Sequence, residues 1–481
     1  IPSDVKVTAR RLGGNRMTGY NWENNASNAG SDWQHYSDNW LIEQYGGGAE
    51  ETGKLLINFH EKSLSMNAYS LITLPLIGYV AKDKKGVVTK EETAPSDRWA
   101  QVIFKKPGEL SLEPDKNDGF VYLDEEINFL IQKYGLSSSA TGVKGYCLDN
   151  EADLWSGTHP RIHPEKAGAE EYINKSIEVS RVIKAMDPGA EVFGPCSYGY
   201  HGYVTWQDAP DFIEARWKYK WYLAYYLARM KEASDKEGKR LLDVLDIHWY
   251  PEAKGEGIRI AFNKGTAEKN AYARVQAPRS LWDKDYVEDS WICGNNNCPL
   301  ELIPRIKRMI DEHYPGTKLS ITEYEYGGGY HPSGGVALAD VLGVFGKYGV
   351  YMANYWMDEW GAYSLAAFRL YRNYDGEGGV FGDRSVRASS SDIEKVTVYA
   401  AADSAKKGVL HIILLNKDIE KPQTAKVSLA SKYVYGSARV WGFDKSTEGK
   451  ITEKPAIGKI KSNTFSLEMP PLSAYHIVLE Q

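Results

Sequence analysis

Two glutamates in the sequence each stand directly after a short apolar segment. Glu151 ends the run Gly-Tyr-Cys-Leu-Asp-Asn-Glu, and Glu323 ends Leu-Ser-Ile-Thr-Glu. One such glutamate is usually an exposed loop residue, but two of them, each in aromatic surroundings, favour chemistry. A pair of carboxyl groups can break a glycosidic bond, because one protonates the leaving oxygen while the other stabilises or traps the cationic anomeric carbon. The pair therefore predicts glycoside hydrolysis.

The residues next to these glutamates refine the predicted site. Asn150 precedes Glu151, and its amide can hydrogen-bond the 2-hydroxyl of a sugar, a contact that tightens in the transition state. Glu325 lies two residues after Glu323, and because side chains on a strand alternate, both could point to the same face. Alternation alone leaves Glu323 and Glu325 as alternatives for the second carboxylate.

Chemistry at strand ends requires elements that bring those ends together. Short β-branched runs alternate with longer amphipathic stretches over the first three quarters of the chain, which is the pattern of βα units around a parallel sheet. We expect an α/β fold, a (β/α)8 TIM-like barrel with its reactive groups at the carboxyl ends of the strands. The predicted strands are residues 16–22, 70–77, 145–149, 191–194, 244–250, 318–323 and 350–356, with an eighth within 5–9 or 41–59. The predicted helices include 123–134, 169–186, 212–233 and 301–312.

A second domain follows the predicted barrel. Residues 375–392 are rich in Gly, Ser and Arg, and beyond them short strands are separated by turn residues without a helical pattern. We predict a catalytic barrel at 10–380 and an all-β sandwich at 385–481, with residues 1–9 as a candidate extra strand of the sandwich. The predicted sandwich strands are 395–401, 408–415, 424–429, 437–443 and 474–479.

Three sequence blocks narrow the assignment. Residues 12–28 read Leu-Gly-Gly-Asn-Arg-Met-Thr-Gly-Tyr-Asn-Trp-Glu-Asn-Asn-Ala-Ser-Asn, residues 148–155 read Leu-Asp-Asn-Glu-Ala-Asp-Leu-Trp, and residues 322–328 read Thr-Glu-Tyr-Glu-Tyr-Gly-Gly. In this order the blocks resemble glycoside hydrolase family 44, a member of clan A. The resemblance implies endo-acting, retaining hydrolysis of β-1,4-glucans such as cellulose derivatives and xyloglucan. It also implies that Glu151 is the acid/base and Glu323 the nucleophile.

The resemblance to clan A implies substrate-binding residues as well. A tyrosine or histidine at the end of the strand over 244–250 holds the nucleophile or contacts the sugar beside it, which favours Tyr250 first and His248 second. His248 could equally be a satisfied core histidine. Trp356 would lie under the same sugar, although alternation also allows it to face the helices.

Other aromatic residues near strand ends are candidate stacking platforms for sugar rings. We predict that Trp22 and Trp155 bind substrate, together with Tyr324 of the matched Thr-Glu-Tyr block. Flat rings with a polar edge suit the apolar faces of sugars, but they also fill protein cores. Core packing is therefore the alternative for Trp22 and for Trp155.

Oxygen-bearing side chains gather between residues 113 and 124, in Glu-Pro-Asp-Lys-Asn-Asp-Gly-Phe-Val-Tyr-Leu-Asp. This spacing suits a calcium loop, and it suits an Asp/Asn turn before a helix somewhat better. Because members of the resembled family hold a structural calcium, Asp115 and Asp118 are predicted as calcium ligands by resemblance. The predicted chemistry itself requires no cofactor.

Composition excludes some partners and favours others. The 58 Lys and Arg residues against 64 Asp and Glu residues give a net charge of −6, without a basic stretch that would follow a phosphate backbone, so we expect no nucleic-acid partner. No apolar run approaches the roughly 20 residues of a membrane span, so we expect no membrane insertion. The chain begins without Met or a signal peptide, which favours a processed, secreted protein. We also expect a monomer.

Two cysteines lie close together in Cys-Gly-Asn-Asn-Asn-Cys, at Cys293 and Cys298. They could close a small disulfide loop in an oxidising compartment. Zinc binding is the weaker interpretation, because a second nearby Cys or His pair is missing.

Two alternatives to a β-1,4-glucanase remain at the level of sequence. The first is another clan A β-glycanase, such as a mannanase or a xylanase, because the catalytic pair is shared and the cleft selects the sugar. The second is a non-catalytic glycan-binding protein with the same aromatic cleft. Loss of one carboxylate would indicate the second alternative, and this sequence keeps both.

Overall fold

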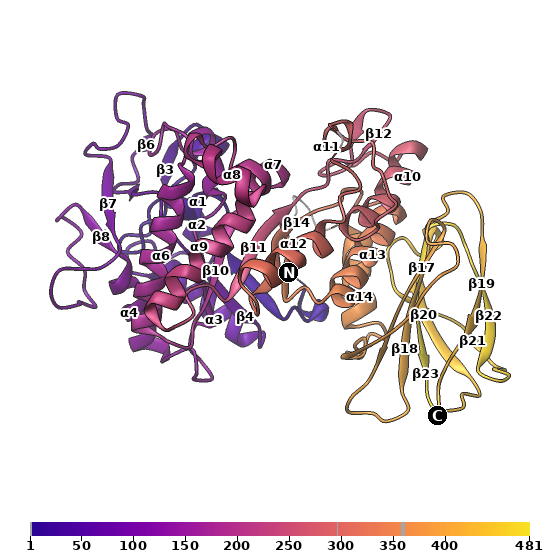
Figure 1. Cartoon of the computed structure of the whole chain (residues 1–481). Helices are drawn as coiled ribbons and strands as arrows, with labels where there is room; N and C mark the ends of the chain where they lie inside the picture. The colour runs from indigo at the N-terminus through magenta and orange to yellow at the C-terminus, as the bar shows by residue number, and fades with distance from the viewer. Residues whose placement is uncertain (1, 296, 357–360) are drawn as a thin grey trace.

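A parallel sheet curved into a barrel forms the larger part of the protein. The computed structural model describes residues 2–295, 297–356 and 361–481, and within them the sheet runs in the order β1-β4-β9-β10-β11-β14-β15 (Figure 1). All neighbouring strands in this order are parallel. The strands are β1 (Ala9–Leu12), β4 (Tyr69–Leu74), β9 (Gly145–Leu148), β10 (Glu191–Ser197), β11 (Val244–Trp249), β14 (Lys318–Tyr324) and β15 (Met352–Tyr355).

The apolar character of the strands explains why this sheet is covered on both faces. Every residue of β9 and of β11 is buried, as expected for parallel strands with helices outside and side chains filling the barrel. The helices between the strands present one apolar face inward. The outer helices are α3 (Lys54–Ser65), α4 (Leu123–Tyr134), α6 (Ala169–Met186), α9 (Tyr222–Glu237), α12 (Leu302–His313), α13 (Pro332–Tyr348) and α14 (Ala362–Arg372).

The barrel prediction is confirmed, but the described residues contribute seven strands to the sheet instead of eight. The edge strands β1 and β15 lie side by side without a ladder of strand pairing, and a cavity of about 530 Å³ lies along their seam. Residues 41–59, a candidate for the eighth strand, contain the end of α2 (Trp40–Glu43) and the first half of α3. Buried positions in α3 recur at helical spacing, which explains the helix: Leu55, Leu56, Phe59, His60 and Ser63.

The first predicted strand is misplaced. Residues 16–22 form the end of α1 (Asn15–Thr18) and a turn, while the strand is the preceding β1. Among the residues described near the N-terminus, Ser3–Val5 is a 3-10 turn that contacts α14, so this segment adds no strand to the sandwich. Its Asp4 accepts a hydrogen bond of 2.6 Å from Arg369 of α14. The second candidate for the eighth strand, residues 5–9, therefore leads only into β1.

Long loops carry the remaining short elements of the barrel domain. Two small sheets follow β1 and β4, and a hairpin follows β11. The strands are β2 (Ser27–Asn28), β3 (Tyr36–Asp38), β5 (Tyr79–Ala81), β6 (Gly86–Val87), β7 (Trp99–Ile103), β8 (Phe120–Tyr122), β12 (Lys254–Gly255) and β13 (Ile258–Arg259). The short helices are α5 (Trp155–Thr158), α7 (Tyr200–Thr205), α8 (Ile213–Tyr219), α10 (Glu268–Gln276) and α11 (Trp291–Gly294).

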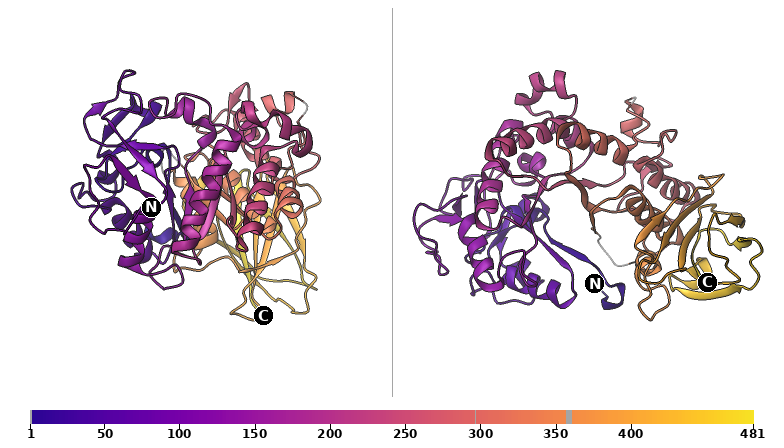
Figure 2. Two further views of the ribbon diagram at one scale, coloured as in Figure 1. Left: turned by 60° about the vertical axis from the view of Figure 1, so that its left-hand side comes forward. Right: turned by 60° about the horizontal axis from the view of Figure 1, so that its bottom comes forward.

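The C-terminal part is an antiparallel sandwich that packs on the last helices of the barrel (Figure 2). Its larger sheet has the order β16-β17-β18-β23-β20-β21, and β19 pairs with β22 across the core. At the contact with the barrel, Asp340 of α13 accepts hydrogen bonds from Thr397 and Tyr399. The strands are β16 (Arg384–Val386), β17 (Val396–Ala402), β18 (Leu410–Asn416), β19 (Gln423–Ser428), β20 (Ala438–Phe443), β21 (Thr452–Ile457), β22 (Thr464–Met469) and β23 (Ser473–Leu479).

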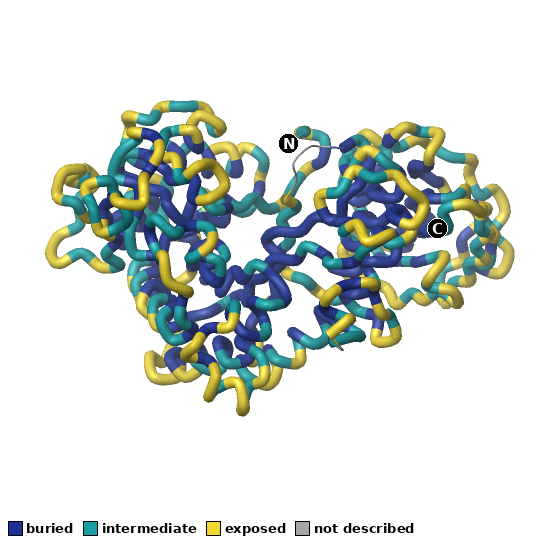
Figure 3. The backbone as a smooth tube through the Cα atoms, turned by 90° about the horizontal axis from the view of Figure 1, so that it is seen from above, coloured by how far each residue is buried: buried dark blue, intermediate teal, exposed yellow. Residues whose placement is uncertain are grey.

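Burial follows this division into two parts. Buried backbone runs through the centre of the barrel and of the sandwich, while exposed segments lie mainly on the outer loops (Figure 3). Within the described ranges, no helix is both long enough and apolar enough to cross a membrane.

Candidate active site

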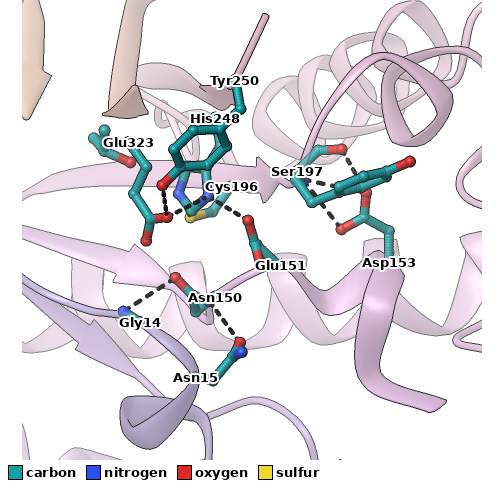
Figure 4. Close-up of polar contacts among 12 residues, drawn as sticks. Gly14, Asn15, Asn150, Glu151, Asp153, Cys196, Ser197, His248, Tyr250 and Glu323 are labelled. Carbon is teal, nitrogen blue, oxygen red and sulfur yellow. Dashed lines mark hydrogen bonds and ion pairs between the residues drawn. The ribbon is translucent and has the colours of Figure 1, made fainter. Parts of the chain in front are cut away.

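The two strand-end glutamates face each other at the carboxyl ends of the barrel strands. Glu151 follows β9 and Glu323 lies near the end of β14, and Figure 4 shows their carboxylates converging with His248 between them. One oxygen of each carboxylate lies within 4.8 Å of the other and of a ring nitrogen of His248. Both glutamates are mostly buried, with side-chain exposures of 13% and 6%. The structure thus brings together the predicted catalytic pair.

His248 lies on β11 between the two carboxylates. Its Nδ1 is 2.8 Å from Oε1 of Glu151 and 3.3 Å from Oε2 of Glu323. Burial lowers the pKa of His248, but its contacts with Cys196 and Glu323 outweigh burial and raise the pKa. This histidine is completely buried and both of its ring nitrogens have partners, but those partners are residues of the site. Its contact with a sugar stays a prediction.

The two glutamates have different surroundings, which suits different roles. Burial raises the pKa of Glu151, and the negative charge of Glu323 adds to this rise, although the hydrogen bond from His248 acts in the opposite direction. Glu323 is held by two donors: Tyr250 Oη lies 2.7 Å from Oε2, and Arg11 Nη1 lies 2.7 Å from Oε1. Glu323 is thus held by a donor at each oxygen, whereas Glu151 is the carboxyl whose pKa is raised, which suits an acid.

Asn150 is fixed beside the pair by three contacts. Its Oδ1 accepts hydrogen bonds from Arg11 Nη2 at 2.7 Å and from the backbone N–H of Gly14 at 3.2 Å. Its Nδ2 donates to Asn15 Oδ1 at 3.2 Å (Figure 4). The amide is only 2% exposed, and its orientation is set by the loop after β1. The predicted contact with a sugar hydroxyl stays a prediction.

Glu325 has a different environment from Glu323, which separates the two alternatives for the second carboxylate. Strand β14 ends at Tyr324, so strict alternation does not extend to Glu325. Its Oε2 accepts a hydrogen bond of 2.5 Å from the backbone N–H of Phe262, and its Oε1 accepts one from the N–H of Gly327. Glu325 therefore joins two loops, and Glu323 is the carboxylate that faces Glu151.

Three predicted stacking residues are core residues instead. Trp22 is 0% exposed and packs 5.4 Å from the ring of Phe129 on α4. Trp155 is also 0% exposed and packs against Tyr172 of α6, and Tyr324 is 1% exposed between other aromatic rings. These predictions were wrong because rings near strand ends turned toward the helices, where burial of a large apolar area stabilises the fold.

Trp356, in contrast, is 42% exposed and lies at the site. It directly follows β15, and its ring is so close to Gly14 that a Cβ at that glycine would lie 2.7 Å from Cη2 of the ring. Gly14 in turn contacts Asn150. The ring therefore lies beside the catalytic residues, where a sugar can reach it.

The predicted calcium ligands lie away from the catalytic centre, on an exposed turn. Asp115 Oδ1 accepts the N–H of Asn117 at 3.0 Å, and Asp118 Oδ1 accepts the N–H of Phe120 at 2.8 Å. This is the geometry of Asp/Asn turns. Neither aspartate belongs to a group of three potential ligands within 4.8 Å in the described parts of the chain. A calcium ion at this turn stays a prediction.

Two groups in the described residues do bring three potential metal ligands within 4.8 Å of one another. One is the catalytic cluster itself. In the other, the positive charge of Arg11 opposes a cation, because Arg11 Nη2 lies 3.1 Å from Sγ of Cys196. The groups are Glu151, His248 and Glu323, and Cys147, Cys196 and Asp246.

Sequence reasoning missed three polar residues of the site: Arg11, Cys196 and Asp153. Cys196 Sγ lies 3.1 Å from Nε2 of His248. Asp153 accepts a hydrogen bond of 2.7 Å from Ser197, and burial raises its pKa to about 7. A signal existed for Arg11, since two adjacent arginines on a barrel strand must point to opposite faces, one of them inward.

The barrel and the facing carboxylates define a glycoside hydrolase. The sequence profile of glycoside hydrolase family 44 matches residues 26–253. The chain is 53% identical to endoglucanase A of Paenibacillus lautus over 479 residues, covering 98% of this chain and 68% of that protein. The chain belongs to glycoside hydrolase family 44.

Two further similarities extend this result. The chain is 51% identical to β-mannanase/endoglucanase A of Caldicellulosiruptor saccharolyticus over 97% of its own length, although it spans only 36% of that protein. Its structure superposes with a TM-score of 0.97 on the family 44 xyloglucanase of Paenibacillus polymyxa, solved with xyloglucan. That pair is 50% identical and covers 100% of this chain and 95% of the other.

Proposed function

We propose that this protein is an endo-β-1,4-glucanase that hydrolyses cellulose derivatives and xyloglucan with retention of configuration. The observation that carries the proposal is the approach of Glu151 and Glu323, whose nearest oxygens lie within 4.8 Å. Carboxyl groups about 5–5.5 Å apart suit a covalent intermediate, whereas inversion needs about 6.5–9.5 Å to admit a water molecule between them and the sugar. The short separation favours double displacement.

In the first step, Glu323 attacks the anomeric carbon while Glu151 protonates the departing glycosidic oxygen. Tyr250 and Arg11 hold the two oxygens of Glu323, so its orientation is set before the substrate arrives. The raised pKa of Glu151 keeps a proton available for the leaving group.

In the second step, Glu151 is a carboxylate and removes a proton from water, which attacks the glycosyl-enzyme ester. Once Glu323 is esterified, its negative charge no longer raises the pKa of Glu151, so Glu151 becomes a better-populated base. His248 Nδ1 lies within hydrogen-bond distance of Glu151 and supports this charged form. One carboxyl group can thus act first as an acid and then as a base.

The names of relatives support the choice of polymer. Proteins that share about half of their residues with this chain are called endoglucanase and xyloglucanase. One of them is also called a β-mannanase, which makes mannan the second candidate substrate. A cleft that accepts only equatorial hydroxyls would favour glucan over mannan.

Three further properties belong to the proposal. A disulfide between Cys293 and Cys298 supports export to an oxidising compartment. Asp115 and Asp118 would hold a structural calcium. Removal of the ion with a chelator should then lower the melting temperature of the protein, and this measurement would test the site. We also propose that the protein acts as a monomer, with the polysaccharide as its partner.

The first test is loss of viscosity and release of reducing ends on carboxymethylcellulose, xyloglucan and mannan. Endo-acting hydrolysis lowers viscosity faster than reducing ends accumulate. Faster hydrolysis of mannan than of both glucans would replace the substrate assignment. If all three polymers stay intact but oligosaccharides derived from them still bind, the protein would be a non-catalytic glycan-binding protein.

A further inference from the structure

An aromatic ring that the mechanism does not use lies beside the nucleophile. Phe262 follows the β12–β13 hairpin, and its side chain is 41% exposed. The centroid of its ring is 4.9 Å from that of Tyr250, with 35° between the ring planes. Tyr250 in turn donates a hydrogen bond from its hydroxyl to Glu323 (Figure 4). The two rings therefore form one surface that begins at the nucleophile.

The backbone holds Phe262 in an unusual conformation. Its φ is 56°, in the left-handed region that a non-glycine residue adopts only when its surroundings hold it there. The surroundings are specific: the N–H of Phe262 donates to the buried carboxylate of Glu325, and the N–H of Gly328 donates to the carbonyl of Asn263 at 2.8 Å.

The neighbouring loop leaves little freedom to this segment. Glu325 also accepts the N–H of Gly327, so one carboxylate joins the loop of Phe262 to the loop after the nucleophile strand. At Gly327 an added Cβ would lie 2.0 Å from the carbonyl oxygen of Ile260, which shows how closely the two loops pack. The segment is rigidly placed, yet it leaves much of an apolar ring in contact with water. Core packing does not explain this arrangement.

We propose that Phe262 is a substrate-binding residue that stacks on the sugar next to the one attacked by Glu323, and that Glu325 is its positioning residue. The chemistry fits a β-1,4-linked glucan, because equatorial hydroxyls leave apolar C–H faces on each ring and an aromatic face packs against them. The inference rests on the proposed glucanase function and adds a subsite residue to it.

The test measures binding of β-1,4-gluco-oligosaccharides of two to six units to the inactive Glu151→Gln protein by calorimetry. Adding Phe262→Ala should weaken binding about 3- to 10-fold for chains that reach the ring and leave shorter chains unaffected. Phe262→Leu, which keeps an apolar side chain without a flat face, should weaken binding similarly. The matched control is Phe120→Ala on β8, since Phe120 is 39% exposed and lies outside the site.

Glu325→Gln tests the positioning role. The amide keeps the size of the side chain, but its NH2 group cannot accept one of the two N–H donors. Binding should weaken as in Phe262→Ala, and the variant with both substitutions should bind no more weakly than Phe262→Ala alone. Additive losses would show that Glu325 does not act through Phe262 and would overturn the positioning role.

The outcomes separate the inference from the function on which it rests. If Glu151→Gln binds the oligosaccharides and Phe262→Ala binds every length equally well, the subsite is refuted and the glucanase proposal stands. If Glu151→Gln binds none of them, the glucan assignment falls and the subsite falls with it. A uniform loss for all lengths would mean that Phe262 merely supports Tyr250, and it would also refute the subsite.

Discussion

Arg11 Nη1 lies 2.7 Å from Oε1 of Glu323, and both side chains are almost completely buried, with exposures of 3% and 6%. The contact joins the first strand of the barrel sheet to the sixth. A buried carboxylate without a partner would destabilise the fold, and this guanidinium supplies that partner. The same guanidinium reaches Asn150, so one side chain aligns both sides of the site.

Arg11→Lys should lower kcat about 10- to 100-fold with little change in KM. An ammonium group can contact Glu323 or Asn150 but cannot reach both with the planar fork of arginine, and hydrogen bonds to charged groups contribute about 1.5–3 kcal/mol. Steady-state kinetics on xyloglucan would measure the change. Arg10→Lys is the matched control, because Arg10 points away from the site to Phe59 and Ser63. Equal kinetics for the two variants would refute this role of Arg11.

Glu151→Gln and Glu323→Gln should differ in how they respond to the leaving group. Loss of the general acid should cost about 10²–10⁴ in kcat on polysaccharide, but little in the first step with an activated aryl cellobioside that needs no protonation. Loss of the nucleophile should abolish turnover of both substrates. Azide should restore turnover of the aryl substrate by Glu151→Gln, because an anion attacks the intermediate without a base. If azide restored turnover only in Glu323→Gln, the roles of Glu151 and Glu323 would be reversed.

Asp153→Asn should alter the pH dependence of stability. Burial raises the pKa of Asp153 to about 7, so between pH 4 and 7 the folded protein holds a proton that the unfolded chain has released. The contribution of Asp153 to the free energy of unfolding therefore falls as pH rises through this window, and asparagine removes that contribution to the slope. Denaturant unfolding at several pH values would measure it. Asp285→Asn, at a 73% exposed side chain, should keep the slope of the parent.

Trp22→Phe should change the stability of the protein, whereas Trp356→Ala should change its KM. Trp22 fills the core, so Trp22→Phe should lower the free energy of unfolding by about 1–3 kcal/mol and leave KM unchanged. Trp356 is exposed at the site, so Trp356→Ala should raise KM about 3- to 10-fold with little change in stability. Thermal unfolding and kinetics on both variants give the comparison. A raised KM in Trp22→Phe at unchanged stability would reinstate Trp22 as a sugar platform.

Acid should destabilise the contact between barrel and sandwich through His476. Its Nδ1 lies 2.7 Å from the carbonyl oxygen of Leu370 on α14, its Nε2 lies 2.9 Å from His411, and burial lowers its pKa to about 3. The unfolded chain binds a proton here below about pH 6.5 that the folded protein refuses, so stability falls as pH drops toward 3, by at most about 5 kcal/mol. His476→Asn keeps a donor to Leu370 and should flatten this slope in unfolding experiments. An unchanged slope would exclude His476 as the cause.

Local periodicity explains which elements could be predicted. The helices at residues 123–134 and 169–186 have the predicted bounds, because apolar residues recur there at helical spacing. The predicted strand at 16–22 was wrong, because a short segment with mixed polar and apolar residues carries no decisive period. The eighth strand has no counterpart in the described residues for a related reason: the segment around Leu55 has buried positions at helical spacing.

The catalytic pair could be predicted from the sequence, since Glu151 and Glu323 each stand at the end of an apolar strand and parallel strands end at the same face of a barrel. The residues that surround the pair follow from the packing of distant segments. Arg11 and Glu323 are 312 positions apart, and no local pattern encodes their contact. The structure also decided that Trp22 is buried and Trp356 is exposed, because the burial of a ring depends on which elements pack against it and not on its place along a strand.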